Sequence, residues 1–320
     1  TPLAAPSRPA IMGQLLSGLS ARRLPRQAPV VSVALEEDLR LLLLHSLPSS
    51  EAELERLGFE RCVDNPEVPG HKYLEGYFHA YPHREVVDSI HPRLGCELLR
   101  RPAPAPLAAF CEAFRRANQA ALVDLEAELG RSPCAEPLAQ VIRRGSHFCD
   151  LSVQVHWGDA VPTEHVGWHV DAGNSYLHMA IGLQGRRALH ARRQLLKGRI
   201  SRNCLLGPGD GREVLWQEVG SAYLGSPCCY PHAVEYPAVD WEHRIIAVQC
   251  RLHLTEEELF GTLSATRHLD MDPRGGTAAI VFKHTTAMRP VVPGLADVQA
   301  VLDEFSEADS LGPPDQRGPA

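Results

Sequence analysis

Pairs of a histidine and an acidic residue separated by one position are the residues of this chain best suited to bind a metal ion. On a β-strand, residues i and i+2 point to the same face, so such a pair can offer an imidazole and a carboxylate to one metal. With 16 histidines and 39 acidic residues among 320, about two such pairs are expected by chance. The chain has three, and their surroundings must decide between them: His83/Glu85, His169/Asp171 and His268/Asp270.

The surroundings favour the middle pair. Strand patterns flank His169 and Asp171 on both sides, and His232 follows 63 residues after His169 in another strand-rich stretch. Two neutral imidazoles and one carboxylate can occupy one triangular face of an octahedral iron, which leaves three positions open for substrate and oxygen. The spacing therefore predicts a metal-binding and catalytic site made of His169, Asp171 and His232.

The other two pairs lack this setting. Only His284 follows His268/Asp270, too near to leave room for the intervening strands of a barrel. His83/Glu85 lies within residues 70–87, a stretch dense in Tyr and His without clear periodicity. We expect that stretch to be a packed loop or the lining of a pocket.

Short strand patterns separated by Gly, Pro and Asn turns fill the region from residue 148 to residue 254. Seven of them in about a hundred residues predict a sandwich or barrel rather than βαβ units, so the predicted fold class is α+β. The expected strands are Leu151–Trp157, Gly167–Asp171, Tyr176–Leu183, Glu213–Gln217, Ser221–Leu224, His232–Tyr236 and Arg244–Leu252. The expected helices are Glu36–His45, a capped helix between Ser50 and Gly58, Ala105–Gly130 and Leu295–Asp309.

Composition excludes several classes of protein. Hydrophobic residues make up 44% and charged residues 22%, an ordinary globular balance, and no apolar run is long enough to span a membrane. A net charge of −7 argues against a dedicated nucleic-acid binder, which needs a basic face. Nine cysteines without a CxxC pair predict a reduced, intracellular protein, with the cytoplasm as the expected location and without a disulfide framework or structural zinc.

Changes in composition along the chain predict its organisation. Residues 1–35 carry four arginines and no acid, and we interpret them as a basic flexible tail or an organelle-targeting segment. Residues 36–147 are expected to form a helical part packed on a core at 148–254. Residues 255–311 then complete the domain with helices and a strand, and residues 312–320 form a Pro/Gly tail.

Three pieces of the region from about residue 148 to residue 254 resemble the 2-oxoglutarate- and Fe(II)-dependent oxygenase superfamily, whose core is a double-stranded β-helix, or jelly roll. They are LSVQVHWGDAVPTEHVGWHVDAGNSYLHMAIGLQGRRAL, EVLWQEVGSAYLGSPCCYPHAVEYP and RIIAVQCRL. In that family the first piece carries HxD, the second the distal histidine and the third a basic residue for the cosubstrate. The resemblance implies His169, Asp171 and His232 as iron ligands and Arg244 as that basic residue. Where many members carry Tyr before HxD, this chain has His156-Trp157.

Charge supports a buried cation near the predicted iron. Ferrous iron with one carboxylate and two neutral imidazoles has one net positive charge, and 2-oxoglutarate adds two negative ones, so one cation restores neutrality. Arg244 is the candidate, since its planar fork can bind a carboxylate through two hydrogen bonds. If Arg244 points inward, residues 246, 248 and 250 share its face and form an apolar lining, whereas inward Arg251 buries the amide of Gln249.

Residues near these positions have weaker assignments. Asn174 and Tyr176 are expected to contact substrate or cosubstrate. Arg186 and Arg187 could bind an acidic substrate, but the interpretation we favour is a solvated hairpin.

The implied activity is hydroxylation of a small-molecule or amino-acid-like substrate, with Fe(II) as cofactor, 2-oxoglutarate and O₂ as cosubstrates, and release of succinate and CO₂. Two alternatives stay open at this point. One is a catalytically silent jelly roll that serves as a binding module. The other is a zinc hydrolase that uses His165, His169 and Asp171 to activate water.

Overall fold

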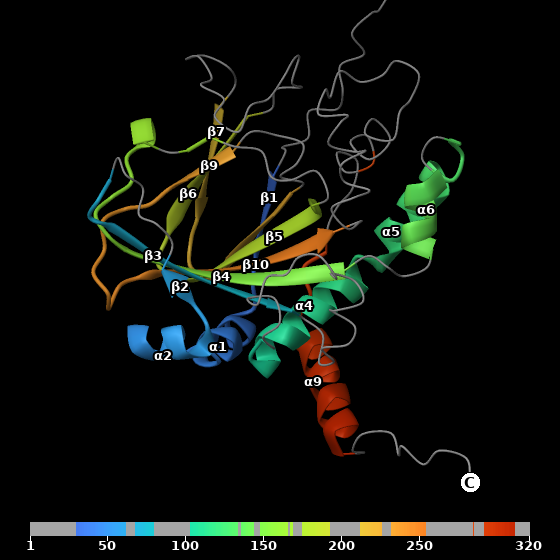
Figure 1. Cartoon of the computed structure of the whole chain (residues 1–320), viewed down its shortest axis with the longest axis horizontal. Coiled ribbons are helices and arrows are strands. Elements are labelled where there is room, and N and C mark those ends of the chain that lie inside the picture. Colours follow the sequence, from blue (N-terminus) through green and yellow to red (C-terminus); the bar gives the residue numbers. More distant parts are fainter. Residues whose placement is uncertain are drawn as a thin grey trace, which may run out of the picture.

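In the computed structural model, the chain forms two antiparallel β-sheets that face each other, with helices packed on the outer side of the larger sheet (Figure 1). The structure describes residues 30–61, 68–79, 103–133, 136–143, 148–165, 167–168, 175–192, 212–225, 232–253, 284 and 291–310.

The large sheet has seven strands in the order β1-β8-β5-β10-β4-β3-β2. Its strands are β1 (Val30–Ala34), β2 (Glu60–Arg61), β3 (His71–His79), β4 (Phe148–Gly158), β5 (Ser175–Gln184), β8 (Ser221–Gly225) and β10 (Ile245–His253). β10 lies in the middle of this sheet and pairs along its length with β4 on one side and β5 on the other.

The small sheet has three strands in the order β7-β6-β9: β6 (Arg187–Arg192), β7 (Arg212–Gln217) and β9 (His232–Glu235). After β5 the chain crosses to the small sheet for β6 and β7, returns for β8, crosses again for β9 and returns for β10. These crossings confirm the predicted α+β fold with a jelly-roll core.

Alternation along the strands gives the large sheet two different faces. Ile246, Val248 and Cys250 of β10 belong to the main apolar cluster, which also contains residues of the helices. Ile245 packs with Tyr236 beside the small sheet. Because side chains alternate every residue, the odd-numbered positions of β10 face the small sheet and the even-numbered ones face the helices.

The helices cover the outer face of the large sheet. They are α1 (Glu37–His45), α2 (Glu51–Leu57), α4 (Ala105–Ala117), α5 (Gln119–Leu129), α6 (Glu136–Arg143) and α9 (Leu295–Ser310). α4 lies nearest the strands and fully buries Leu107, Phe110 and Phe114 in the main cluster. The apolar side chains at these three- and four-residue steps therefore fix α4 on the sheet.

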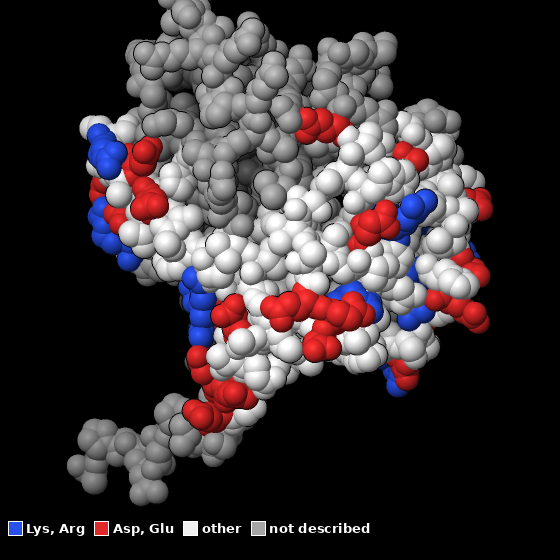
Figure 2. All heavy atoms as spheres, turned by 180° about the vertical axis from the view of Figure 1, so that it is seen from behind, with Lys and Arg blue, Asp and Glu red and all other residues white. Residues whose placement is uncertain are grey.

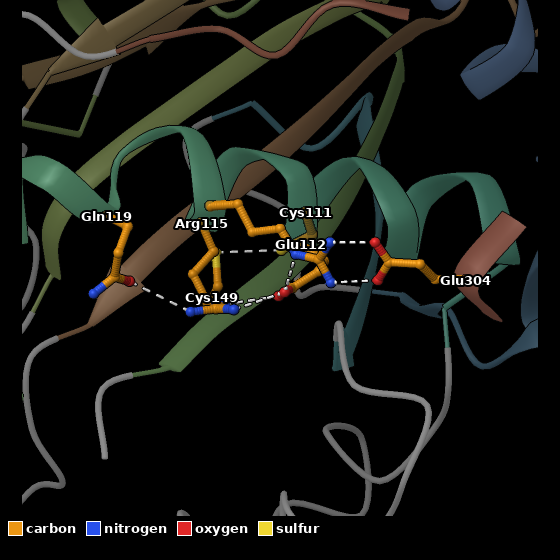
Figure 3. Close-up of polar contacts among 7 residues, drawn as sticks. Cys111, Glu112, Arg115, Gln119, Cys149 and Glu304 are labelled. Carbon is orange, nitrogen blue, oxygen red and sulfur yellow. Dashed lines mark hydrogen bonds and ion pairs between the residues drawn. The ribbon is translucent and has the colours of Figure 1, made fainter. Parts of the chain in front are cut away.

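Polar contacts join α4 to α9 and to the sheet (Figure 3). Arg116 donates two hydrogen bonds of 2.8 Å to Glu304 of α9 and one of 2.8 Å to Glu112. Glu112 also accepts two hydrogen bonds from Arg115. Burial raises the pKa of Glu112, but the two arginines more than offset this and hold that pKa below its usual value.

Charged side chains of both signs are mixed over the face of the molecule that Figure 2 shows. Most of the ion pairs are exposed, including Arg143 with Glu126 and Arg186 with Glu218. Exposed pairs of this kind contribute little to stability. Most of the stabilisation therefore comes from the buried apolar cluster. Among the helices that the structure describes, none combines the length and the apolar character needed to cross a membrane.

The predicted long helix at 105–130 is wrong in its middle. The chain forms α4 and α5 with a break at Asn118, whose φ is −102° and ψ is 8°. The Asn118 amide donates to the carbonyl groups of Phe114 and Val291, and its oxygen accepts from the Val291 backbone N–H. The side chain of Asn118 thus links the break to a distant segment, which apolar periodicity could not indicate.

Four described segments form strands that the sequence reading did not expect, namely β1, β2, β3 and β6. Residues 30–34, assigned to the basic tail, form β1 and pair with β8. Residues 71–79, read as a loop, form β3 and pair with β4, so the part from 36 to 147 is not wholly helical. The helix expected after Thr255, the strand expected at 277–283, most of residues 1–35 and the tail at 312–320 lie outside the described residues.

Candidate active site

Every second side chain of β6 and β9 points from the small sheet toward the large sheet. Ala191 is paired with His232, and it packs with Ala180 and Tyr223 of the large sheet. His232 therefore shares this inner face, at the first position of β9, and only 6% of its surface is exposed. The predicted distal histidine thus lies where a group bound between the sheets can reach it.

The residues described on either side of the predicted HxD pair, Trp168 and Ser175, lie beside the small and the large sheet respectively. The ring centroid of Trp168 is 6.3 Å from that of His190, and His190 is paired with Ala233, the residue after His232. Ser175 begins β5 and is paired with the last residue of β10. The segment between them, residues 169–174, lies outside the described part of the chain.

Several predicted site residues fall in that segment. His169, Asp171 and Asn174 lie outside the described residues, and of Tyr176 only the backbone, in β5, is described. Within the described ranges, no group of three potential ligands gathers to hold a metal ion. His165, the ligand of the zinc alternative, ends a short 3-10 turn, Thr163–His165.

A buried arginine occupies the opposite end of the inner face. Arg187 is the first residue of β6, and its side chain points between the sheets with 1% of its surface exposed. Its Nε donates to Gln217 Oε1 at 2.7 Å, and its Nη1 donates to Gln154 Oε1 at 3.0 Å and to the Tyr236 hydroxyl at 3.4 Å. Nη2 has no hydrogen-bond partner.

Amide side chains hold Arg187 in place. Gln217 Nε2 donates to the Ala180 carbonyl, and Gln154 Oε1 also accepts from Gln249 Nε2 at 2.6 Å. Gln154 Nε2 donates to the Tyr73 hydroxyl. These amides are themselves satisfied by other partners, so the guanidinium is fixed by a network rather than by single contacts.

Stacked rings form a wall beside this network. The ring of His156 lies between those of Tyr73 and Tyr236, with centroids 4.2 Å and 3.9 Å away. Burial, together with the charge of Arg187 and the neighbouring His71, holds the pKa of His156 well below its usual value. His156 is therefore a neutral base here, and its buried Nε2 has no hydrogen-bond partner.

The tautomers of His71 and His156 follow from the contacts of their ring nitrogens. Nδ1 of His71 is 3.1 Å from the Asp159 carbonyl, so it carries the proton. Nε2 of His71 then accepts from Nδ1 of His156, 3.1 Å away. The buried Nε2 of His156 is consequently the acceptor nitrogen of its ring.

Arg244 lies apart from this network, just before β10. Its guanidinium stacks on the Trp241 ring at 4.6 Å from the centroid, and its Nη1 donates to the Trp241 carbonyl. Trp241 packs against the main apolar cluster, and its ring meets Trp157 edge-on. Burial lowers the pKa of Arg244.

The predicted lining of the cavity face by residues 246, 248 and 250 is wrong. Those residues face the helices, and the inner face of β10 carries Gln249 and Arg251 instead. The expected cost of a buried amide does not arise, because Gln249 contacts Gln154, Ser152 and Arg251. The role of Arg244 as the cosubstrate arginine stays a prediction.

Arg187 is the site residue that sequence reasoning missed. The preferred interpretation of Arg186 and Arg187 as a solvated hairpin is correct for Arg186, whose side chain is 60% exposed, and wrong for Arg187. Gly185, with φ of 66°, makes the turn between β5 and β6. A strand that starts directly after this turn places neighbouring arginines on opposite faces, and that alternation was the available signal.

Comparisons with known proteins give structural similarities only. No protein-family model and no curated protein matches the chain. The epimerase SnoN, solved with Fe³⁺, alpha-ketoglutarate and nogalamycin RO, is 15% identical at a TM-score of 0.40, over 71% of this chain and 80% of that one. The Arabidopsis thaliana dioxygenase for auxin oxidation 1, in its 2-oxoglutarate complex, is 13% identical at 0.38, over 72% and 84%.

A Pseudomonas putida prolyl-4-hydroxylase is 9% identical, with a TM-score of 0.33 over 71% of this chain and 94% of that one.

Proposed function

We propose that this protein is an Fe(II)- and 2-oxoglutarate-dependent dioxygenase that hydroxylates a small-molecule or amino-acid-like substrate. The observation that carries the proposal is the position of His232 on the inner face of the small sheet, next in the chain to Ala233, whose partner His190 contacts the ring of Trp168. His169 follows Trp168 directly in the chain, and Asp171 follows two residues later. This order of residues along the chain supports a joint role for the HxD pair and His232.

The donor set suits ferrous iron. His169, His232 and Asp171 would hold the ion with two neutral imidazoles and one carboxylate, which leaves coordination positions open. When bound, iron and 2-oxoglutarate supply activation of O₂ coupled to oxidative decarboxylation. The protein contributes apolar surface, because Leu189 and Val234 lie between the two ends of the inner face.

The direct test is anaerobic addition of Fe(II) and then 2-oxoglutarate to the purified chain, followed by absorption spectroscopy. We expect a visible charge-transfer band that saturates at one equivalent of iron, and succinate release when O₂ is admitted. His169→Ala, Asp171→Ala and His232→Ala should each abolish the band and the succinate, because two protein ligands hold the metal too weakly.

Matched controls are histidines outside this set. His45→Ala, on an exposed position of α1, should leave the band unchanged, as should His83→Ala and His268→Ala. Near-normal succinate release from Asp171→Ala would contradict the proposal.

The alternatives give different results in the same assay. A silent binding module retains no stoichiometric iron and shows no band. A zinc hydrolase is active with zinc in the absence of O₂ and depends on His165.

A further inference from the structure

Arg187 is a buried charge, and the neighbours that the structure describes around it are neutral. Its hydrogen-bond partners are the oxygens of Gln154, Gln217 and Tyr236, and the ring of Tyr223 lies 5.9 Å from its guanidinium carbon. In the part of the chain that the structure describes, no carboxylate forms an ion pair with it. The nearest acid in the network, Glu75, is separated from Arg187 by the side chain of Gln154.

A fully buried guanidinium without an anion is costly, and arginine cannot escape the cost by losing its proton. The two N–H groups of Nη2 are also left without acceptors. Water could accept those hydrogen bonds, but it would not neutralise the charge. A bound anion with two oxygens does both, because a carboxylate matches the fork of a guanidinium.

The register of the small sheet sets the length of that anion. His232 lies opposite Ala191, and Tyr236 lies beside Arg187, four residues from Ala191 on β6. Four residues of strand cover about 13 Å between backbone positions. A short, linear molecule with an acid group at each end therefore fits between the end that holds His232 and Arg187.

We propose that Arg187, not Arg244, binds the distal carboxylate of 2-oxoglutarate. This assignment rests on the proposed function for the identity of its ligand. Arg187 offers both N–H groups of Nη2 to the carboxylate, and the Tyr236 hydroxyl, which accepts from Nη1, donates its own proton to the same group. Arg244 instead stacks on the ring of Trp241, which packs against the main apolar cluster, and donates to the Trp241 carbonyl.

Tyr236 suits a donor role at any physiological pH. Burial raises the pKa of Tyr236 to about 12, against the lowering effect of Arg187. Its hydroxyl therefore stays protonated beside the guanidinium.

The experiment measures the dissociation constant of 2-oxoglutarate, by titration of the anaerobic Fe(II) protein, for wild type, Arg187→Met, Arg187→Lys and Arg244→Met. Arg186→Met, a change of the adjacent exposed arginine, is the matched control. We expect Arg187→Met to weaken binding about 30-fold or more, as for removal of one partner of a buried charge pair. Arg187→Lys should lose less affinity than Arg187→Met. Arg244→Met and Arg186→Met should bind 2-oxoglutarate as tightly as wild type does.

A second ligand identifies which end of the molecule Arg187 binds. 2-Oxopentanoate has the same keto acid and chain length but no distal carboxylate. Wild type should bind 2-oxoglutarate much more tightly than 2-oxopentanoate, and Arg187→Met should bind the two about equally. Unchanged binding of 2-oxoglutarate to Arg187→Met, or a large loss confined to Arg244→Met, would overturn the assignment.

A metal-free measurement separates this inference from the proposed function. Glutarate has both carboxylates and no keto group, so it can reach Arg187 without iron. If wild type gives no iron–2-oxoglutarate band, the proposed function fails. In that case thermal protection by glutarate of wild type, but not of Arg187→Met, still supports Arg187 as a carboxylate site, and equal or absent protection overturns it.

Discussion

The two faces of the large sheet are built from the same strands but from different chemistry. Toward the helices, β4, β5 and β10 carry side chains such as Val153, Ile181 and Val248, all fully buried in one apolar cluster. Toward the small sheet, β4 and β10 carry Gln154, Gln249 and their hydrogen-bonded neighbours. Apolar burial stabilises a fold without directing a ligand, whereas a polar network fixes donors and charges in space. We therefore expect outer-face changes to reduce stability and inner-face changes to reduce ligand binding.

The largest effect on stability is expected on the outer face. Phe110→Ala removes a fully buried ring from α4 and should lower the free energy of unfolding by about 3–5 kcal/mol. Urea unfolding monitored by circular dichroism measures this. The affinity of the remaining folded protein for 2-oxoglutarate should be unchanged. Val123→Ala, at an exposed position of α5, is the control and should change stability by less than about 0.5 kcal/mol.

An inner-face change in β10 tests the other half of the comparison. Gln249→Val removes the amide that contacts Gln154, Ser152 and Arg251, and should cost about 1–3 kcal/mol of stability. Because Gln154 then loses a partner that holds it against Arg187, binding of 2-oxoglutarate should weaken as well. Isothermal titration with 2-oxoglutarate compares the affinity of Gln249→Val with that of Phe110→Ala. Loss of stability with unchanged affinity would mean that the two faces do not differ in this way.

The sequence predicts the outer face of the large sheet better than the inner face. The outer-face residues of β4, β5 and β10 repeat with regular spacing, so the strand ends were predicted to within a few residues. The polar residues of the inner face carry no periodic signal of their own. Arg187 and His156 became recognisable only when strand pairing placed them beside Tyr236. The break at Asn118 likewise depends on contacts with Val291, a residue far away in the chain.

Acid should weaken the outer side of the molecule through Glu112. The pKa of Glu112 is lower in the folded protein than its usual 4.5 in an unfolded chain, since its hydrogen bonds to Arg115 and Arg116 outweigh burial. The unfolded state thus binds more protons as the pH falls through 4.5, and the stabilisation is complete above that pH and lost below it. We expect a loss of about 1–2 kcal/mol, measured by unfolding at a series of pH values.

Glu112→Gln provides the comparison for this pH series. It should be less stable than wild type at neutral pH, and the difference should narrow as the pH falls below 4.5. A difference that stays constant down to pH 3 would exclude Glu112 as the group responsible.

The smallest effect is expected at Arg186, the neighbour of Arg187. Arg186 lies over the exposed ring of Trp216 and forms a long ion pair of 3.8 Å with Glu218. Arg186→Ala should therefore change the free energy of unfolding by less than about 0.5 kcal/mol and leave ligand binding intact. Thermal unfolding at low and high salt measures this. If Arg186→Ala weakened the binding of 2-oxoglutarate as much as Arg187→Met does, the turn rather than the direction of each side chain would determine the affinity.

The position of β10 in the large sheet has a consequence for how the protein is made. β10 separates β4 from β5, although both are synthesised well before it. Until residue 253 has left the ribosome, β4 and β5 each present an open strand edge, and the apolar side chains of the future outer face remain uncovered. The nascent chain therefore passes through a long interval in which it can associate with other chains. Synthesis that stops before β10 should yield an aggregating product, and chaperones that bind extended apolar segments should protect it.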